Sequence, residues 1–505
     1  MKLSAVLWLS LLGMGVSSAT VAWLTPQASA SRPSPGAAAP SLTPSSSPQT
    51  AVTAPGLPPD PPPTASPSFT VDGPLRLEAR LGHASLPGAE GGETFVMVEV
   101  AAPTDTTGQA RAPVNLSIVI DRSGSMKGQR LTNAIAAARG MLARLRPDDT
   151  VSLVAYDDRA ELLIAPTPVD RLDAFVFERT LSSLRGRGHT CMSCGLDMAL
   201  TQVRRRSGAV NRVLLLSDGV ANRGLTSVED FRIIGDQARR EQTAVASIGV
   251  DLDYDERPLF AVSQASNGNH YFVENPAGLP AVFEREAESL VSTIADRVDV
   301  DVMLAPGVEL LDVVARGHRR EGDRVALSFG TLNAGEDRSA VLRVRLPAGH
   351  GAAPVADVRL AYRDLIESRD RRADGELSLV LDPERDELAA LDVRVEERLG
   401  RKNTLDALLL ANEAFASGDL AGAQRQLEAA KAEIEQRRTR TAATPTAAPG
   451  TAIDDGFQQQ LDALGRAQSS FDEAAEEAPA PKAAAKSSKG KKALKLNAAV
   501  ANPFG

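Results

Sequence analysis

The sequence predicts an α/β protein in which a doubly wound, mostly parallel sheet is flanked by, or inserted in, an antiparallel β-sandwich, with a helical region after it. Between residues 112 and 295, short β-branched runs alternate with amphipathic helical stretches, which is typical of a parallel sheet covered on both faces. On either side, at 69–111 and 296–383, apolar and polar residues alternate with a period of two, as in antiparallel strands. From residue 384 the periodicity becomes helical.

The α/β region begins with the run VNLSIVI, which reads as a buried strand. The stretch after it, RLTNAIAAARGMLARL, repeats its apolar residues at helical spacing and is predicted to be a helix. The pattern recurs along the region, with RVLLLS and TAVASIGV as further strands and SVEDFRIIGDQARREQ as a helix between them. The flanking strands, such as TFVMVEVAA before and AVLRVRLPAG after, are expected to join into one sandwich.

The amino end predicts export. Leu3 to Leu24 carry no charge, and Ala28-Ser29-Ala30 fit a signal-peptidase site. Residues 1–30 are therefore expected to be either a cleaved signal peptide or a membrane anchor that spans the bilayer through residues 3–24. Both alternatives predict an extracytoplasmic protein, secreted, periplasmic or anchored to the cell membrane. Residues 31–68, rich in Pro, Ala and Ser, are expected to form a disordered linker.

The carboxyl end is predicted to be helical only in part. Residues 384–440 contain two amphipathic stretches around a Ser-Gly-Asp turn and predict a helical hairpin. Residues 441–505 are rich in Ala, Pro and Lys, so we expect a largely disordered tail with one helix, at 457–477. The formal net charge of −9 argues against a nucleic-acid partner despite the lysines of this tail.

Five oxygen-bearing side chains follow predicted strands or lie between them. The sequence DRSGSM directly after VNLSIVI contains Asp121, Ser123 and Ser125, Thr190 lies in the region between two strands, and Asp218 follows RVLLLS. These segments are expected to meet at the carboxyl edge of the sheet, where ligands bind in folds of this type. Carboxylates and hydroxyls are suitable ligands for a hard divalent cation, and Mg²⁺ in particular retains open or water-filled positions.

This pattern resembles the von Willebrand factor A domain and its metal-ion-dependent adhesion site. The motif D-x-S-x-S is met by Asp121, Ser123 and Ser125, the threonine loop by Thr190 and the D-G loop by Asp218, although His189 replaces the usual glycine before the threonine. The region is most similar to exported bacterial proteins whose domain resembles those of inter-alpha-trypsin-inhibitor heavy chains and calcium-activated chloride-channel regulators. The resemblance implies one bound cation, Mg²⁺ first and Mn²⁺ or Ca²⁺ as alternatives. It also implies binding of a protein partner that presents an Asp or Glu carboxylate, and no catalysis.

The two cysteines of the chain, Cys191 and Cys194, leave alternatives open. In an exported protein they are expected either to form a disulfide that supports the turn presenting Thr190, or to pack as two small buried residues. An enzyme is the second functional hypothesis, as a thiol-disulfide catalyst using this pair or as a metal-dependent enzyme. A zinc site with His189 lacks the second ligand pair that structural zinc usually has. A third hypothesis is a scaffold that docks partners through its C-terminal helices.

The acidic run GVDLDYDE follows the strand TAVASIGV and begins like a calcium-binding loop. Its sixth position is Glu256 where such loops need glycine, and its twelfth is Val262 where they need glutamate. We therefore interpret it as an acidic loop at the rim of the predicted metal site.

Overall fold

The computed structural model describes residues 65–104, 111–204, 208–252, 254–315, 317–478 and 480–499. The predicted signal or anchor segment and nearly all of the predicted linker lie outside these residues. Within the described ranges, no helix is both long and apolar enough to span a bilayer.

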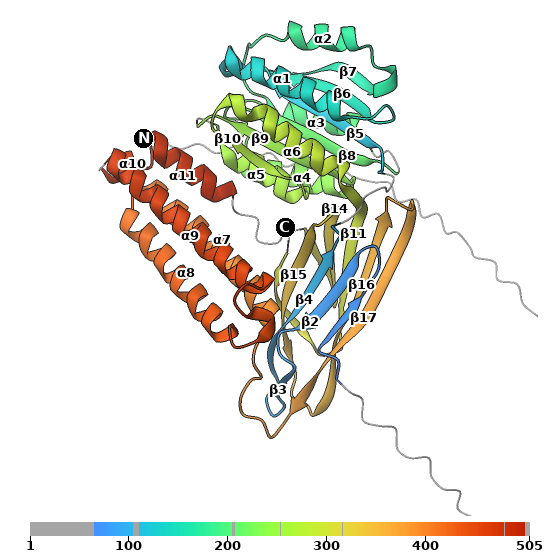
Figure 1. Cartoon of the computed structure of the whole chain (residues 1–505), viewed down its shortest axis with the longest axis vertical. Helices are drawn as coiled ribbons and strands as arrows, with labels where there is room; N and C mark the ends of the chain where they lie inside the picture. Colours follow the sequence, from blue (N-terminus) through green and yellow to red (C-terminus); the bar gives the residue numbers. More distant parts are fainter. Residues whose placement is uncertain are drawn as a thin grey trace, which may run out of the picture. The chain divides into compact units, whose positions relative to one another are not determined.

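The α/β region contains a six-stranded sheet in the order β10–β9–β8–β5–β6–β7 (Figure 1). All neighbouring strands are parallel except β6 and β7, which are antiparallel. Every residue of the central strand β5 is buried because helices cover both faces of the sheet. The strands are β5 (Val114–Asp121), β6 (Thr150–Tyr156), β7 (Ala160–Pro168), β8 (Val210–Ser217), β9 (Thr243–Val250) and β10 (His270–Val273).

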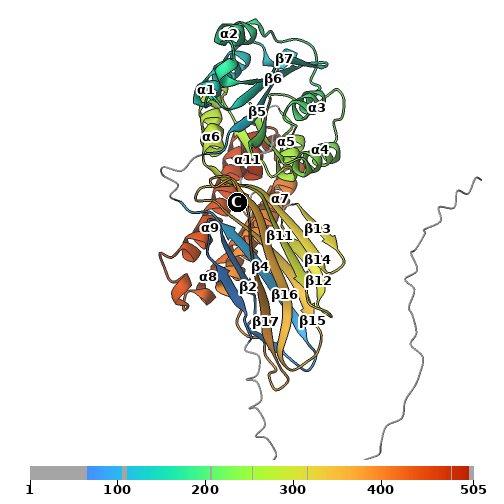
Figure 2. The ribbon, with the colours of Figure 1, turned by 90° about the vertical axis from the view of Figure 1, so that its right-hand side faces the viewer.

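Alternate residues of the strands pack against different helices, which gives the domain two cores (Figure 2). Ile118 and Ile120 of β5 face one core, whereas Val119 between them faces the other. The first core is closed by α1 (Gln129–Arg144), α2 (Ala174–Ser183) and α6 (Leu279–Val291). The second is closed by α3 (Met192–Gln202), α4 (Val228–Arg240) and α5 (Glu256–Ala265).

Strands from both sides of the α/β region pair with one another and form a β-sandwich. In one sheet β4, which precedes the α/β region, pairs along its whole length with β15, which follows it. That sheet contains β1 (Ser68–Val71), β2 (Arg76–Leu81), β4 (Gly92–Ala101), β15 (Asp337–Leu346) and β12 (Glu309–Val314), in this order. The second contains β13 (His318–Glu321), β14 (Arg324–Asn333), β11 (Thr293–Leu304), β16 (Gly351–Asp364), β17 (Arg369–Asp382) and β3 (Ser85–Pro87).

Aliphatic side chains of the two sheets share one core, which includes Leu77, Val98 and Leu342 from the first sheet and Val300, Leu360 and Leu379 from the second. The α/β domain is thus an insertion between strands of the sandwich. The predicted fold class, a doubly wound sheet with an antiparallel sandwich and C-terminal helices, is confirmed.

The C-terminal region differs from the predicted disordered tail, because helices continue almost to the end of the described chain. Phe457, Leu464 and Phe471 recur every seven residues and are all fully buried. The ring of Phe471 stacks on that of Phe415, with ring centroids 4.2 Å apart. This apolar stripe outweighs the Ala- and Lys-rich composition on which the expectation of disorder rested.

The helices of this region are α7 (Val393–Ser417), α8 (Leu420–Thr441), α9 (Ala452–Glu477), α10 (Pro481–Ala484) and α11 (Ser488–Ala499). Short 3₁₀ turns lie at Gly124–Met126, Val169–Arg171, Pro276–Gly278 and Pro445–Ala447. The third helix α9 and the final helix α11 contribute to the same core as the hairpin of α7 and α8, and so cover the apolar face that a lone hairpin would expose.

Candidate metal site

The sheet topology brings two of the predicted acidic residues together. Strand β5 lies between β6 and β8, so the order in which strands are added reverses at this point, and ligands of doubly wound sheets bind at such a reversal. Asp121 is the last residue of β5, and Asp218 directly follows β8. Because β5 and β8 are parallel neighbours, both carboxylates emerge at the same edge.

Asp121 is held rigidly by its own loop and by the neighbouring strand. Its Oδ1 accepts a hydrogen bond of 2.7 Å from the backbone N–H of Ser123, and its Oδ2 accepts one of 2.8 Å from the hydroxyl of Ser217. The side chain is fully buried. Burial raises the pKa of Asp121 to about 6; the bonds from Ser123 and Ser217 oppose this shift, and the nearby charge of Asp218 adds to it. A positive ion beside this carboxylate would offset the cost of keeping it ionised.

The hydroxyls of the D-x-S-x-S loop connect the two acidic residues. Ser123 Oγ lies 2.9 Å from Ser125 Oγ, and the Ser125 hydroxyl donates a 2.7 Å hydrogen bond to Asp218 Oδ1. The other carboxylate oxygen of Asp218, Oδ2, is buried and accepts no hydrogen bond. Burial also raises the pKa of Asp218, although the bond from Ser125 and the charge of Arg130 oppose it.

Thr190 is fixed in a loop that is clamped to the loop after β8. Its backbone N–H donates to Asn222 Oδ1 at 2.9 Å, and the Asn222 N–H donates to the Thr190 carbonyl at 3.1 Å. The loop after β8 also contains Gly219, where an added Cβ would stand 3.5 Å from Thr190 Oγ1 and 3.6 Å from Ser125 Oγ. The structure therefore brings all five predicted oxygen-bearing residues to one edge of the sheet.

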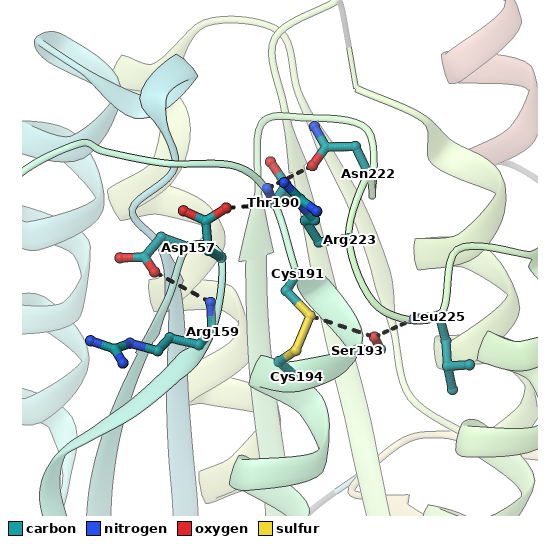
Figure 3. The surroundings of a disulfide bond; sticks show 10 residues. Asp157, Arg159, Thr190, Cys191, Ser193, Cys194, Asn222, Arg223 and Leu225 are labelled. Atoms are coloured by element: carbon teal, nitrogen blue, oxygen red, sulfur yellow. Dashed lines mark hydrogen bonds and ion pairs between the residues drawn. A yellow bond between two sulfur atoms is a disulfide. The ribbon is translucent and has the colours of Figure 1, made fainter.

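A disulfide joins Cys191 to Cys194 directly beside Thr190, at the start of α3 (Figure 3). Its surroundings are tightly packed: a Cβ at Gly224 would approach Cys191 Sγ to 2.7 Å. Ser193, inside the disulfide loop, accepts a 2.9 Å hydrogen bond from the N–H of Leu225. The disulfide loop thus packs against the segment that follows the D-G loop.

Arg130, in the first turn of α1, is a site residue that the sequence pattern did not identify. Its Nη1 lies 3.2 Å from Asp218 Oδ2 and donates a 2.8 Å hydrogen bond to the carbonyl of Ser125. Its Nε donates to Asp251 Oδ2 at 3.1 Å, and Nη2 also pairs with that carboxylate. In the sequence, the only sign of this role is a basic residue at the start of the helix after D-x-S-x-S. Its partner Asp251 is more than a hundred residues away, so the sequence does not indicate the pairing.

The acidic loop after β9 contains Asp251, which pairs with Arg130, and Asp255, which caps helix α5. Asp251 takes a left-handed backbone conformation, with φ 71°, and Asp255 accepts a 3.1 Å hydrogen bond from the backbone of Arg257 at the start of α5. Asp253 lies outside the described residues. Among those that are described, no cluster of three or more His, Cys, Asp or Glu side chains could hold a metal.

The five residues nevertheless suit a hard divalent cation. They offer only oxygen atoms, from two carboxylates and three hydroxyls, and the buried Asp218 Oδ2 accepts no hydrogen bond, although Arg130 Nη1 lies 3.2 Å from it. A set with few charged ligands and several neutral ones is compatible with Mg²⁺, which is commonly held by one or two carboxylates.

Comparison with known proteins identifies the class of domain. Residues 116–220 match the model of the von Willebrand factor type A (VWA) domain, so the chain contains a VWA domain. The solved structure of a von Willebrand factor type A protein from Catenulispora acidiphila superposes with a TM-score of 0.61 over 76% of this chain and 95% of that one, at 16% identity. At this identity the likeness shows the fold alone.

Two curated relatives extend the comparison. The uncharacterized protein sll0103 of Synechocystis is 24% identical over 358 residues, 68% of this chain and 83% of its own. The inter-alpha-trypsin inhibitor heavy chain H2 of Mus musculus is 26% identical over 167 residues, which is 31% of this chain and 17% of the heavy chain. The expected similarity to these heavy chains is therefore confirmed for a part of their length.

Proposed function

We propose that this chain is an extracytoplasmic protein-binding module whose VWA domain captures a partner with the help of a divalent cation. VWA domains typically mediate protein–protein interactions. The observation that carries the proposal is that three loops bring five oxygen-bearing side chains to one edge of the sheet, where Asp218 Oδ2 is buried and accepts no hydrogen bond.

Each residue has a distinct role in this proposal. Asp121 and Asp218 supply the negative charge, and Ser123, Ser125 and Thr190 supply neutral oxygens. Mg²⁺ is the expected ion, with Mn²⁺ or Ca²⁺ as alternatives; when bound, it offers an open coordination position to an Asp or Glu carboxylate of the partner. Hydrogen bonds within and between the loops hold Asp121 and Thr190 in place, which supports a site that is largely formed before the ion binds.

A catalytic role for the cysteines is not part of this proposal. Cys191 is 1% exposed, and its sulfur is bonded to Cys194. A dithiol catalyst needs an accessible nucleophilic thiolate, whereas Cys191 Sγ is packed so closely against Gly224 that an added Cβ there would lie 2.7 Å from it. The position of the pair beside Thr190 instead supports a structural role.

The proposal is tested by capturing partners from the extracytoplasmic fraction of the source cells on the immobilised chain. Partners should be retained with Mg²⁺, released by EDTA, and not retained by Asp121→Ala. Asp170→Ala removes an exposed acidic residue of the same domain and should behave as the wild type. Circular dichroism checks that each variant is folded. Retention that survives both EDTA and Asp121→Ala contradicts metal-dependent binding, and detection of the native chain only in the cytoplasm contradicts the proposed location.

A further inference from the structure

Arg130 places a permanent positive charge against one of the two carboxylates of the candidate metal site. Its guanidinium lies between Asp218, at 3.2 Å from Oδ2, and Asp251 on the loop after β9. The position is unfavourable for α1 itself, because the amino end of a helix already carries partial positive charge and the first turn of α1 contains no acidic residue. The two carboxylates therefore compensate a charge that the helix alone would disfavour.

A divalent ion and Arg130 compete electrostatically for the same carboxylate. Asp218 Oδ2 is buried, so its interactions with both cations are only weakly screened by solvent. Asp251 reduces the repulsion between Arg130 and the ion, since it neutralises part of the Arg130 charge from the other side of the guanidinium. The hydrogen bond from Arg130 to the Ser125 carbonyl contributes less to the site, because the Ser125 hydroxyl is held independently by Ser123 and Asp218.

We propose that Arg130 and Asp251 form a charge pair that sets the metal affinity of the VWA site, with Arg130 weakening the binding of the ion and Asp251 restoring part of it. This inference rests on the metal binding proposed above. The concentration range over which the site fills is then determined by a residue pair outside the five ligands.

The test measures Mn²⁺ affinity of the full chain from the electron paramagnetic resonance signal of the free ion, with Mg²⁺ as competitor. Arg130→Met removes the charge at similar length and should tighten Mn²⁺ binding on the order of tenfold, as expected for removal of a like charge near a partly buried site. Arg130→Lys keeps the charge and should stay near the wild-type affinity. Asp251→Asn should weaken binding, and asparagine tolerates the left-handed backbone at this position.

The matched control is Arg139→Met, which removes an arginine of the same helix whose partner is the exposed Glu178. It should leave the Mn²⁺ affinity unchanged. If the wild type binds Mn²⁺ but Arg130→Met binds it equally or more weakly, the inference is wrong while the proposed metal site stands. If neither the wild type nor any variant binds Mn²⁺, the proposed metal site is wrong as well. Thermal melting of each variant separates these results from loss of the fold.

Discussion

Thr190 lies where three constraints meet: the disulfide on its carboxyl side, the hydrogen bonds to Asn222, and Gly219 across the site. A threonine hydroxyl is a weak metal ligand and contributes only if its position is fixed in advance. The disulfide loop provides part of this fixation, because it packs against the segment that carries Asn222 and Leu225 (Figure 3). The two cysteines, the only ones in the chain, therefore stand beside the threonine hydroxyl of the proposed metal site.

The disulfide is expected to be present in the native protein and to stabilise it modestly. Cysteine alkylation before reduction should add no label, and alkylation after reduction should add two. Cys194→Ser should lower the free energy of unfolding by less than the ~3 kcal/mol expected for a 15-residue loop, because the closed loop is much shorter. Native protein that takes up both labels without reduction would show that the pair is a free dithiol.

The meeting of the five oxygen-bearing residues at one edge of the sheet could be predicted from the sequence, because each belongs to a short motif and the motifs follow one another in the expected order. The roles of Arg130 and Asn222 could not be predicted, because each depends on a segment remote in the sequence: Arg130 in α1 contacts the loop after β9, and Asn222 contacts the loop before α3. Asp251 was expected only to lie near the rim, and its pairing with Arg130 needs the parallel order of β5, β8 and β9.

The last helix, α11, shows how tertiary contacts can override composition. Lys495 was expected in a solvated tail, yet its side chain is 4% exposed. Its Nζ donates a 2.7 Å hydrogen bond to the carbonyl of Tyr254, lies 3.0 Å from Glu256 and stands 3.6 Å from the centroid of the Tyr254 ring. Lys492 also pairs with Glu274, at 2.7 Å. These contacts tie α11 to the VWA domain at the acidic loop after β9, at the start of α5 and just after β10.

Lys495→Met should therefore weaken the attachment of α11 while keeping the length of the side chain. We expect a loss of about 2 kcal/mol in the free energy of unfolding, typical of a hydrogen bond made by a charged group. Faster amide hydrogen exchange should appear in α11 and in residues 254–260. Lys489→Met is the control, because that lysine is half exposed and lies 3.7 Å from an exposed glutamate. Equal exchange in the two variants would mean that Lys495 does not hold the helix.

The whole molecule combines an inserted VWA domain with a sandwich built from both of its flanks. This arrangement was predictable because the period of two on either side of the α/β region indicates strands with one buried face. Such strands need neighbours to pair with, and the two flanks can supply them to each other. The attachment of the C-terminal helices to the sandwich could not be predicted from the sequence. It relies in part on the buried Arg398 of α7, which contacts Glu99 and the half-exposed Asp337 of the sandwich at 2.8 and 2.7 Å. An arginine in an amphipathic helix gives no sign of such a partner.

Calorimetric titration of Mg²⁺ into the purified full chain shows whether this edge of the sheet holds a divalent cation. We expect a single saturable site per chain that is lost in Asp121→Ala, weakened in Thr190→Val and unchanged in Asp170→Ala. Absence of Mg²⁺ and Mn²⁺ binding to the folded wild type, or binding that Asp121→Ala leaves intact, would contradict the proposed metal site.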